Sequence, residues 1–194
     1  MKLLLATNNK HKVKEMTEIF ADMDYEIISP KDIGLVLDVD ENGNTFAENA
    51  MIKAKAFCEA SGYAALADDS GLVVECLGGE PGVYSARYGG EGLDDAGRTQ
   101  LLLKNMEGKT DRRAAFVCAI AMVFPDGRLL TAEGECRGNI AQKAYSSQGF
   151  GYDPVFVPEG FDKTFTELGA EIKNPISHRG RALAELKKKL EKLA

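Results

Sequence analysis

The feature that most constrains this chain is an acidic stretch between two apolar runs. Ala67-Asp68-Asp69-Ser70-Gly71 follows Ala64-Ala65-Leu66 and precedes Leu72-Val73-Val74. Short β-type runs separated by two carboxylates, a hydroxyl and a glycine predict a strand, a functional turn and a second strand. Adjacent Asp side chains repel each other unless positive charge lies beside them, and a divalent cation that takes oxygen ligands would supply it. A polar surface turn is the alternative, because Asp, Ser and Gly are common turn residues.

Length and composition indicate an ordinary globular protein. The 194 residues fit a single domain spanning 1–194, or one domain with a lobe, and 44% of them are hydrophobic and 28% charged. No run approaches the roughly 18 apolar residues of a membrane span, and Met1–Ala6 is too short for a signal peptide. We therefore expect a cytoplasmic protein with no membrane partner.

Charge and cysteine usage exclude two further classes. A net charge of −6 argues against direct binding to a nucleic acid backbone, which requires a basic surface. Cys58, Cys76, Cys118 and Cys136 contain no close pair of the kind that zinc or redox motifs use. We expect these cysteines to be reduced and mostly buried.

The N-terminal segment predicts a phosphate-binding turn. Lys2–Ala6 is a short buried-type strand, and Val13, Met16, Phe20 and Met23 form one face of a following helix. A strand, a polar turn and a helix start bring backbone N–H groups and the positive end of the helix dipole to one point. A helix capped by an Asn is the plain alternative. The residues of this turn are Thr7, Asn8, Asn9, Lys10, His11 and Lys12.

A second acidic loop, Asp38–Asn44, precedes another helix. Thr45 and Glu48 have the spacing of a capping box, which predicts the helix start. Asn49 and Lys53 are four residues apart and therefore share one helix face. Lys53 either lies along the helix surface or reaches back toward the acidic loop.

The second half of the chain contains strands and two polar motifs. A helix over Asp94–Met106 and a hairpin of Ala114–Phe124 with Arg128–Cys136 are predicted by pattern and turn residues. Phe150-Gly151-Tyr152-Asp153-Pro154 precedes the strand-like Val155–Val157. It could stack a base and bind its edge, or form a turn with packed aromatic rings.

The last helix begins with an unusual pair of cations. Ser177 is the expected N-cap, and the apolar face consists of Leu183, Leu186, Leu190 and Leu193. His178 and Arg179 fall in the first turn, where positive charge opposes the helix dipole. An electrostatically unfavourable placement hints at function, because another interaction must favour it.

Taken together and in this order, these stretches resemble the inosine/xanthosine triphosphate pyrophosphatase family. The resemblance covers the chain from end to end, and each motif alone is weaker than the series. The motifs are Thr7–Lys12, Thr45-Phe46-Ala47-Glu48-Asn49-Ala50, Ala67–Gly71, Leu77-Gly78-Gly79 with Pro81–Tyr88, Phe150–Pro154 and Ile176-Ser177-His178-Arg179.

The resemblance implies an α/β fold with a long, strongly twisted mixed sheet flanked by helices, and two lobes with a central cleft. It also implies a Mg²⁺-dependent homodimer. The implied reaction converts deaminated purine nucleoside triphosphates (ITP, dITP, XTP) to the monophosphate and pyrophosphate. Such an enzyme cleanses the nucleotide pool and prevents incorporation of these nucleotides into DNA and RNA.

The resemblance also implies roles for individual residues. Phosphates would bind the Thr7–Lys12 turn with Lys53 nearby, and Mg²⁺ would be held by Asp69 and, in the second loop, by Asp40. Asp69 is also the implied proton acceptor, although an ordinary Asp, with a pKa of about 3.9, is a weak base. A metal-activated water is therefore favoured, and both roles of Asp69 stay open. The implied base and sugar contacts are Phe150, Gly151, Tyr152, Asp153, Lys173, His178 and Arg179, with Ser70 near the sugar or phosphates.

Base choice would rest on hydrogen-bond polarity. Hypoxanthine and xanthine carry an acceptor oxygen at position 6, where adenine carries an amino donor. A pocket of N–H groups and cations would pair with the oxygen and leave the amino group unpaired, at about 1–3 kcal/mol per contact. Two alternatives remain: a pyrophosphatase for pyrimidine or modified nucleotides, and a noncatalytic nucleotide sensor.

Overall fold

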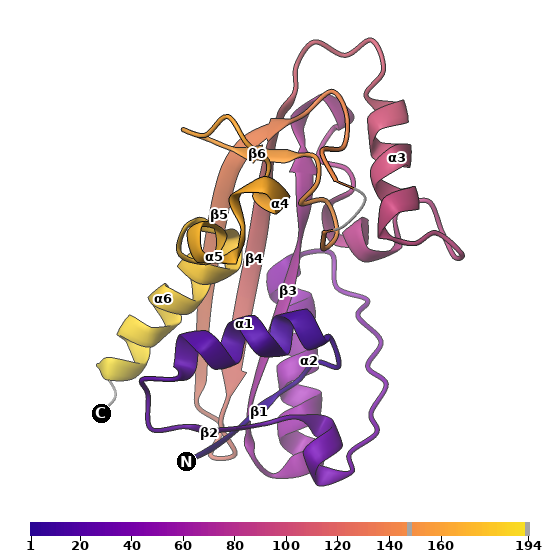
Figure 1. The fold of residues 1–194 in the computed structure, drawn as a ribbon. Helices are drawn as coiled ribbons and strands as arrows, with labels where there is room; N and C mark the ends of the chain where they lie inside the picture. The colour runs from indigo at the N-terminus through magenta and orange to yellow at the C-terminus, as the bar shows by residue number, and fades with distance from the viewer. Residues whose placement is uncertain (147–148, 193–194) are drawn as a thin grey trace. The chain divides into compact units, whose positions relative to one another are not determined.

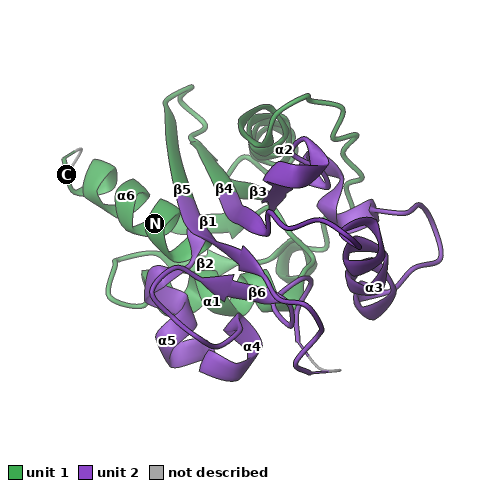
Figure 2. Cartoon of the chain, turned by 90° about the horizontal axis from the view of Figure 1, so that it is seen from above, with its two compact units in different colours: residues 1–69, 118–134, 179–194 green, residues 70–117, 135–178 purple. Residues whose placement is uncertain are grey.

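The computed structural model describes residues 1–146 and 149–192, and it contains two compact units. Unit 1 consists of residues 1–69, 118–134 and 179–194, and unit 2 of residues 70–117 and 135–178 (Figure 2). Leu193, predicted to lie on the last helix face, is outside the described residues. Each unit has its own hydrophobic core, so each is described by itself.

A six-stranded sheet has the strand order β2-β1-β3-β4-β5-β6 (Figure 1). β1 pairs in parallel with β2 and with β3, whereas β5 pairs antiparallel with β6. The mixed α/β fold predicted from the sequence is thereby confirmed. The strands are β1 (Lys2–Leu5), β2 (Glu26–Ile28), β3 (Ala64–Val74), β4 (Arg113–Val123), β5 (Leu129–Ile140) and β6 (Phe156–Pro158).

Four of the helices, α1, α2, α3 and α6, occupy predicted positions, whereas α4 and α5 were not predicted. The terminal motif gives one more helix than expected, because α5 precedes α6 and contains Pro175. Ser177 directly precedes α6 and is the C-cap of α5, with its hydroxyl donating to the Asn174 carbonyl at 3.2 Å, so its role as N-cap of α6 stays a prediction. The α-helices are α1 (Lys10–Phe20), α2 (Phe46–Ser61), α3 (Asp95–Asn105), α4 (Phe165–Leu168), α5 (Ala170–Ile176) and α6 (His178–Glu191). The 3₁₀ turns are η1 (Pro30–Ile33), η2 (Glu75–Leu77) and η3 (Gly82–Arg87).

The acidic stretch is not a turn, and this sequence prediction is wrong. β3 runs without a break through Asp68, Asp69, Ser70 and Gly71. Turn-type residues can occupy a strand when side chains from other segments neutralise their charge, because tertiary contacts override local preference. In this strand, Lys12 and Arg179 neutralise Asp68.

The start of α2 is only half as predicted. The Thr45 side chain accepts a hydrogen bond from the Glu48 N–H at 3.1 Å, which is the N-cap contact. The Glu48 carboxylate, however, accepts from the Asn44 N–H at 2.6 Å rather than from Thr45. The helix start is confirmed, and the reciprocal contact falls one residue earlier, on the acidic loop.

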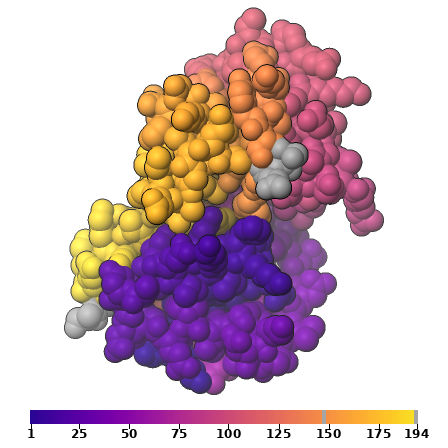
Figure 3. Space-filling model, in the orientation of Figure 1, coloured from indigo at the N-terminus to yellow at the C-terminus, as the bar shows by residue number. Residues whose placement is uncertain are grey.

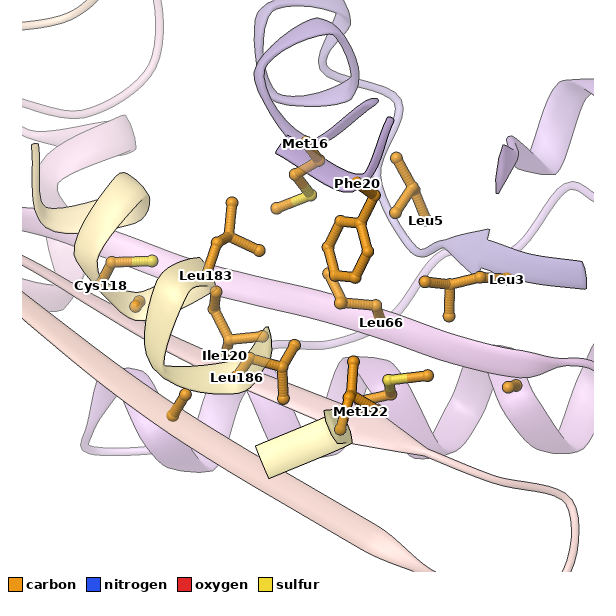
Figure 4. Close-up of a cluster of buried hydrophobic side chains, with 14 of the residues drawn as sticks. Leu3, Leu5, Met16, Phe20, Leu66, Cys118, Ile120, Met122, Leu183 and Leu186 are labelled. Carbon is orange, nitrogen blue, oxygen red and sulfur yellow. The ribbon is translucent and has the colours of Figure 1, made fainter. Parts of the chain in front are cut away.

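The main core of unit 1 lies between the strands and two helices. Leu3, Leu5, Leu66 and Ile120 point from the sheet toward α1 and α6 (Figure 4). Met16 and Phe20 of α1 and Leu183 and Leu186 of α6 belong to the same cluster, and all of these side chains are at most 1% exposed. In the space-filling view, the indigo N-terminal residues and the yellow C-terminal residues belong to this unit (Figure 3).

Unit 2 has a separate aromatic core. Phe116 packs against Phe156 and Phe165, with ring centroids 4.6 and 5.9 Å apart. Leu102 of α3 and Met106, the C-cap residue of this helix, are fully buried in the same cluster, as the helix pattern predicts. This core carries the motifs around Phe150 and His178.

The structure also bears on the expectations for the cysteines and for membrane spans. The four cysteines are free thiols, and Cys58, Cys118 and Cys136 are buried. Among the described residues, no helix is both long and apolar enough to cross a membrane. The single-domain assignment and the cleft implied by the resemblance stay predictions.

Candidate active site

Asp68 is the centre of an ion-pair cluster in unit 1. Its Oδ2 lies 3.0 Å from Lys12 Nζ and 3.2 Å from Arg179 Nε, and the carboxylate is 1% exposed. Burial by itself raises the pKa of Asp68, but Lys12, Arg179 and Lys53 outweigh it and hold the pKa far below its usual range. Asp68 is therefore a permanent anion that anchors cations from three distant segments.

Arg179 explains the unfavourable charge at the start of α6. The side chain is almost fully buried, and besides Asp68 it binds Glu15 of α1 through Nη1. Burial opposes its charge, yet Asp68 and Glu15 keep the pKa of the guanidinium above its ordinary value. The two carboxylates offset the helix dipole, so this cation joins α1, β3 and α6 in one network.

Asp69 lies next to this cluster but in a different environment. Its Oδ2 accepts a hydrogen bond from Asn49 Nδ2 at 3.0 Å. Burial raises its pKa; the Asn49 hydrogen bond and Lys53 lower it, Glu41 raises it further, and the net shift is upward. A carboxylate with a raised pKa is a better proton acceptor near neutral pH than an ordinary Asp.

Lys53 joins β3 to the second acidic loop. Its Nζ donates to the backbone carbonyl of Asp68 at 3.2 Å and lies 2.9 Å from Glu41 Oε2. Of the two open alternatives for Lys53, the structure thus supports the reach toward the loop. Asp40, the implied metal ligand, is exposed, and Glu41 is the loop carboxylate that acts on Asp69.

The N-terminal turn is shaped by internal hydrogen bonds. Asn9 Oδ1 accepts from the N–H groups of His11 and Lys12 at 3.0 and 3.4 Å, and Thr7 Oγ1 accepts from the Asn9 N–H at 3.1 Å. Asn9 therefore caps α1. Asn8, Lys10 and His11 are exposed, while Lys12 turns inward to Asp68.

The donor set of this cluster fits a hard divalent cation. Asp68 Oδ1 is buried and has no hydrogen-bond partner among the described residues, and Asp69 and Glu41 add two more carboxylates. No group of three or more His, Cys, Asp or Glu with metal-site geometry occurs in the described part of the chain. Mg²⁺ does not need such a cage, because it commonly binds one or two carboxylates together with substrate phosphates and water.

The second group of candidate residues lies in unit 2. Lys173 Nζ binds Asp153 Oδ2 at 2.6 Å, and both side chains are about nine-tenths buried. The same Nζ lies 5.6 Å from the centre of the Phe165 ring. The His178 ring stacks on Phe116 with centroids 4.7 Å apart and planes 12° apart. Charged and aromatic groups are thus brought together here.

Tyr152 is built into the protein interior. Its ring belongs to the core of unit 2, and its hydroxyl donates to the backbone carbonyl of Ser85 at 2.8 Å. Burial raises the pKa of this phenol. Phe150 and Ser70 are half-buried. The packed-aromatic alternative therefore describes the Tyr152 side chain, and Phe150 is the more accessible ring of the motif.

Several residues of the site were not among the sequence candidates. Asp68, Glu15 and Glu41 balance the cations, Asn49 binds Asp69, and Phe116 stacks on His178. Asn49 carried a signal, because it shares a helix face with Lys53. Asp68 and Glu41 lie in the two acidic stretches, although neither was assigned a role from the sequence, whereas no local pattern marks Glu15 or Phe116.

The fold and these two groups of residues define a class: an α/β protein with a cation and carboxylate cluster suited to phosphates and a separate polar, aromatic cluster. A family model described as the Ham1 family matches residues 3–189. The chain belongs to the Ham1 family, which confirms the resemblance.

Individual relatives agree over the full length. The chain is 49% identical over 195 residues to the dITP/XTP pyrophosphatase of Desulforamulus reducens, covering 100% of this chain and 97% of that protein. It is 45% identical to the dITP/XTP pyrophosphatase of Bacillus subtilis, covering 97% and 96%. The structure of the Staphylococcus aureus Ham1 protein matches with a TM-score of 0.91 and 42% identity, covering 100% of both chains.

Proposed function

We propose that this protein hydrolyses deaminated purine nucleoside triphosphates (ITP, dITP and XTP) to the monophosphate and pyrophosphate, and so removes them from the nucleotide pool. The relatives named dITP/XTP pyrophosphatases are similar over almost their entire length. The observation that carries the proposal is the environment of Asp69, a half-buried carboxylate that accepts a hydrogen bond from Asn49 and lies beside a cluster containing Lys12, Lys53 and Arg179.

In this proposal the chain supplies charge and a proton acceptor. The helix start at Thr7–Lys12 and the side chains of Lys12 and Lys53 bind the phosphates. Water attacks the α-phosphorus, the bond from that phosphorus to the oxygen bridging to the β-phosphate breaks, and pyrophosphate leaves. Asp69 accepts the proton that the water loses, and Asn49 holds the carboxylate in position.

We include Mg²⁺ dependence in the proposal. Asp69 would hold the ion together with a carboxylate of the second loop. Glu41 is better placed than Asp40 for this role, because it lies at Lys53 and influences Asp69. When bound, the ion would neutralise phosphate charge and lower the pKa of a bound water.

The polar cluster of unit 2 would recognise the base. Lys173 and His178 are donors suited to the oxygen at position 6, and Phe150 offers a ring for stacking. Asp153 holds Lys173 in place. Adenine would face donors with its amino group and bind more weakly.

The deciding experiment identifies the products formed from ITP. Inosine monophosphate and pyrophosphate are expected, and inosine diphosphate with phosphate would contradict the proposal. Rates with ITP, XTP, dTTP, UTP and GTP separate this function from a pyrimidine pyrophosphatase. Tight ITP binding without turnover would instead indicate a sensor.

The homodimer implied by the resemblance and the cytoplasmic location expected from the composition also remain proposals. Light scattering on the purified chain would test the first, with a mass near twice 21.0 kDa expected. Cell fractionation would test the second.

A further inference from the structure

Two side chains of α3 bind both backbone polar groups of Gly151. The Gly151 N–H donates to Asp95 Oδ2 at 3.0 Å, and Thr99 Oγ1 donates to the Gly151 carbonyl at 3.3 Å. Asp95 and Thr99 are four residues apart and therefore lie on the same face of the helix. All three residues belong to unit 2, in which α3 is labelled in Figure 2.

These contacts act on a turn that the Asp153 N–H closes onto the Phe150 carbonyl at 3.1 Å, a hydrogen bond that does not by itself set the direction of the peptide between Gly151 and Tyr152. Gly151 has φ +58, a conformation that glycine adopts readily because it has no Cβ. Its N–H belongs to the peptide plane shared with Phe150, and its carbonyl belongs to the plane shared with Tyr152. Asp95 and Thr99 therefore orient the two peptide planes on either side of the glycine.

The orientation of the second plane sets a hydrogen-bond donor. In a trans peptide the N–H and C=O groups point in opposite directions. Because the Gly151 carbonyl faces Thr99, the N–H of Tyr152 points away from α3. The Tyr152 ring cannot readily follow a rotation, since its hydroxyl is bound to the Ser85 carbonyl.

Such a donor has the polarity that an oxygen at purine position 6 requires. An amino group at the same position would present a second donor and lose its own partner. A rotated 151–152 peptide would present its carbonyl instead and favour the amino group. The direction of this one peptide plane thus separates the two kinds of ring.

We propose that Asp95 and Thr99 are positioning residues that fix the Gly151 peptides and thereby set selectivity for 6-oxopurines over adenine. This inference rests on the proposed function. Neither side chain needs to touch the substrate.

The first test compares Thr99→Val, which removes the hydroxyl, with Thr99→Ser, which keeps it. For ITP we expect Thr99→Val to raise KM roughly 3- to 10-fold, the value of one hydrogen bond, with kcat changed less than about twofold. Its preference for ITP over ATP, as the ratio of kcat/KM values, should fall by a similar factor. Thr99→Ser should stay close to the unmodified protein. Unchanged KM and unchanged preference in Thr99→Val would overturn the inference.

A second pair of variants, at Asp95, keeps the inference testable if Thr99→Val fails to fold, because Thr99 is buried. Asp95→Ala removes the acceptor for the Gly151 N–H, whereas Asp95→Asn retains an acceptor oxygen. We expect the loss of preference in Asp95→Ala to be partly restored in Asp95→Asn. Equal behaviour of these two variants would count against a positioning role.

Asp94→Ala is the matched control for damage to the helix. Asp94 caps α3 by accepting from the Gly97 N–H at 2.8 Å, and among the described residues Gly151 is held by Asp95 and Thr99, not by Asp94. It should lower the melting temperature and leave the ITP preference intact. The same loss of preference in Asp94→Ala would show a merely structural effect. If the unmodified protein does not hydrolyse ITP at all, the proposed function fails; if it does and Thr99→Val keeps its preference, only this inference fails.

Discussion

At the scale of residues, the two adjacent aspartates have opposite properties. Asp68 is buried against Lys12 and Arg179 and has a lowered pKa, whereas burial and Glu41 raise the pKa of Asp69 despite its hydrogen bond from Asn49. Their different surroundings give the two carboxylates different roles: Asp68 anchors cations, and Asp69 can accept a proton.

Replacing Asp69 should remove catalysis while the fold survives. Asp69→Asn keeps the size of the side chain and an oxygen that can accept the Asn49 hydrogen bond, but it cannot take a proton. We expect kcat for ITP to fall about 10²- to 10⁴-fold, the usual contribution of a general base. Pyrophosphate release measures it, and near-normal turnover would refute the role of Asp69.

Replacing Asp68 should act mainly on stability. Asp68→Asn leaves Lys12 and Arg179 without their shared buried anion, and breaking such a pair from one side costs about 3–5 kcal/mol. Urea unfolding measures the loss. Asp22→Asn is the control, because the pair of Asp22 with Lys187 is at the surface, and its unfolding midpoint should not change. Equal midpoints for the two variants would contradict the anchoring role.

Gly43 provides a local test of how Asn49 is held. Its N–H donates to Asn49 Oδ1 at 2.8 Å, and an added Cβ would lie 2.7 Å from that oxygen and 2.7 Å from the Glu48 Cβ. Gly43→Ala should therefore displace Asn49 from Asp69 and lower kcat several-fold. Gly34→Ala is the control for backbone strain without a steric clash, because an added Cβ there meets nothing within 4 Å but the backbone has φ +64. This variant should be less stable than the unmodified protein and have the same kcat. Full activity of Gly43→Ala would show that Asn49 is not needed.

At the scale of elements, α2 presents the functional face to β3. Asn49 and Lys53 reach Asp69 and the Asp68 carbonyl from successive turns of the same helix. The N-cap at Thr45 therefore stabilises the element that carries both side chains.

Removing this cap should weaken the helix measurably. Thr45→Ala loses the contact to the Glu48 N–H, which is worth about 1 kcal/mol, and it should lower the unfolding free energy by that amount. Thr45→Ser, which can form the same cap, should restore it. Chemical denaturation of the unmodified protein and the two variants measures these unfolding free energies. Equal values for Thr45→Ala and the unmodified protein would show that the cap contributes nothing to stability.

Most elements were predictable from the sequence, because their signals are local. Apolar periodicity and capping residues predict α1, α2, α3 and the β4–β5 hairpin. The same local logic fails at β3, where Asp-Asp-Ser-Gly has turn composition and the compensating cations come from Lys12 and Arg179. It also misses α5, which contains Pro175.

The candidate site shows the same difference between local signals, which could be predicted, and long-range contacts, which could not. The motifs could be located because each has a recognisable composition, but the partners within the site could not. Glu15 and Arg179 are 164 positions apart, and Asn49 and Asp69 are 20 apart. Nothing in either local sequence encodes the other, so only the folded chain assigns these contacts.

At the scale of the whole molecule, two cores share three continuous strands. β3, β4 and β5 each begin in one unit and end in the other, at residues 69 and 70, 117 and 118, and 134 and 135. Each of these strands continues across the boundary without interruption. Unfolding of either core would therefore disrupt strands that also belong to the other core.

We therefore expect a single cooperative unfolding transition. Leu186→Ala in unit 1 and Phe156→Ala in unit 2 each remove a fully buried side chain, which costs about 2–5 kcal/mol. Both should lower the midpoint of one common transition, with fluorescence and circular dichroism curves coinciding. Leu129→Ala, at a side chain that is 43% exposed, should leave the midpoint nearly unchanged. Two separate transitions, with each core variant shifting only one of them, would mean that the units unfold independently despite their shared strands.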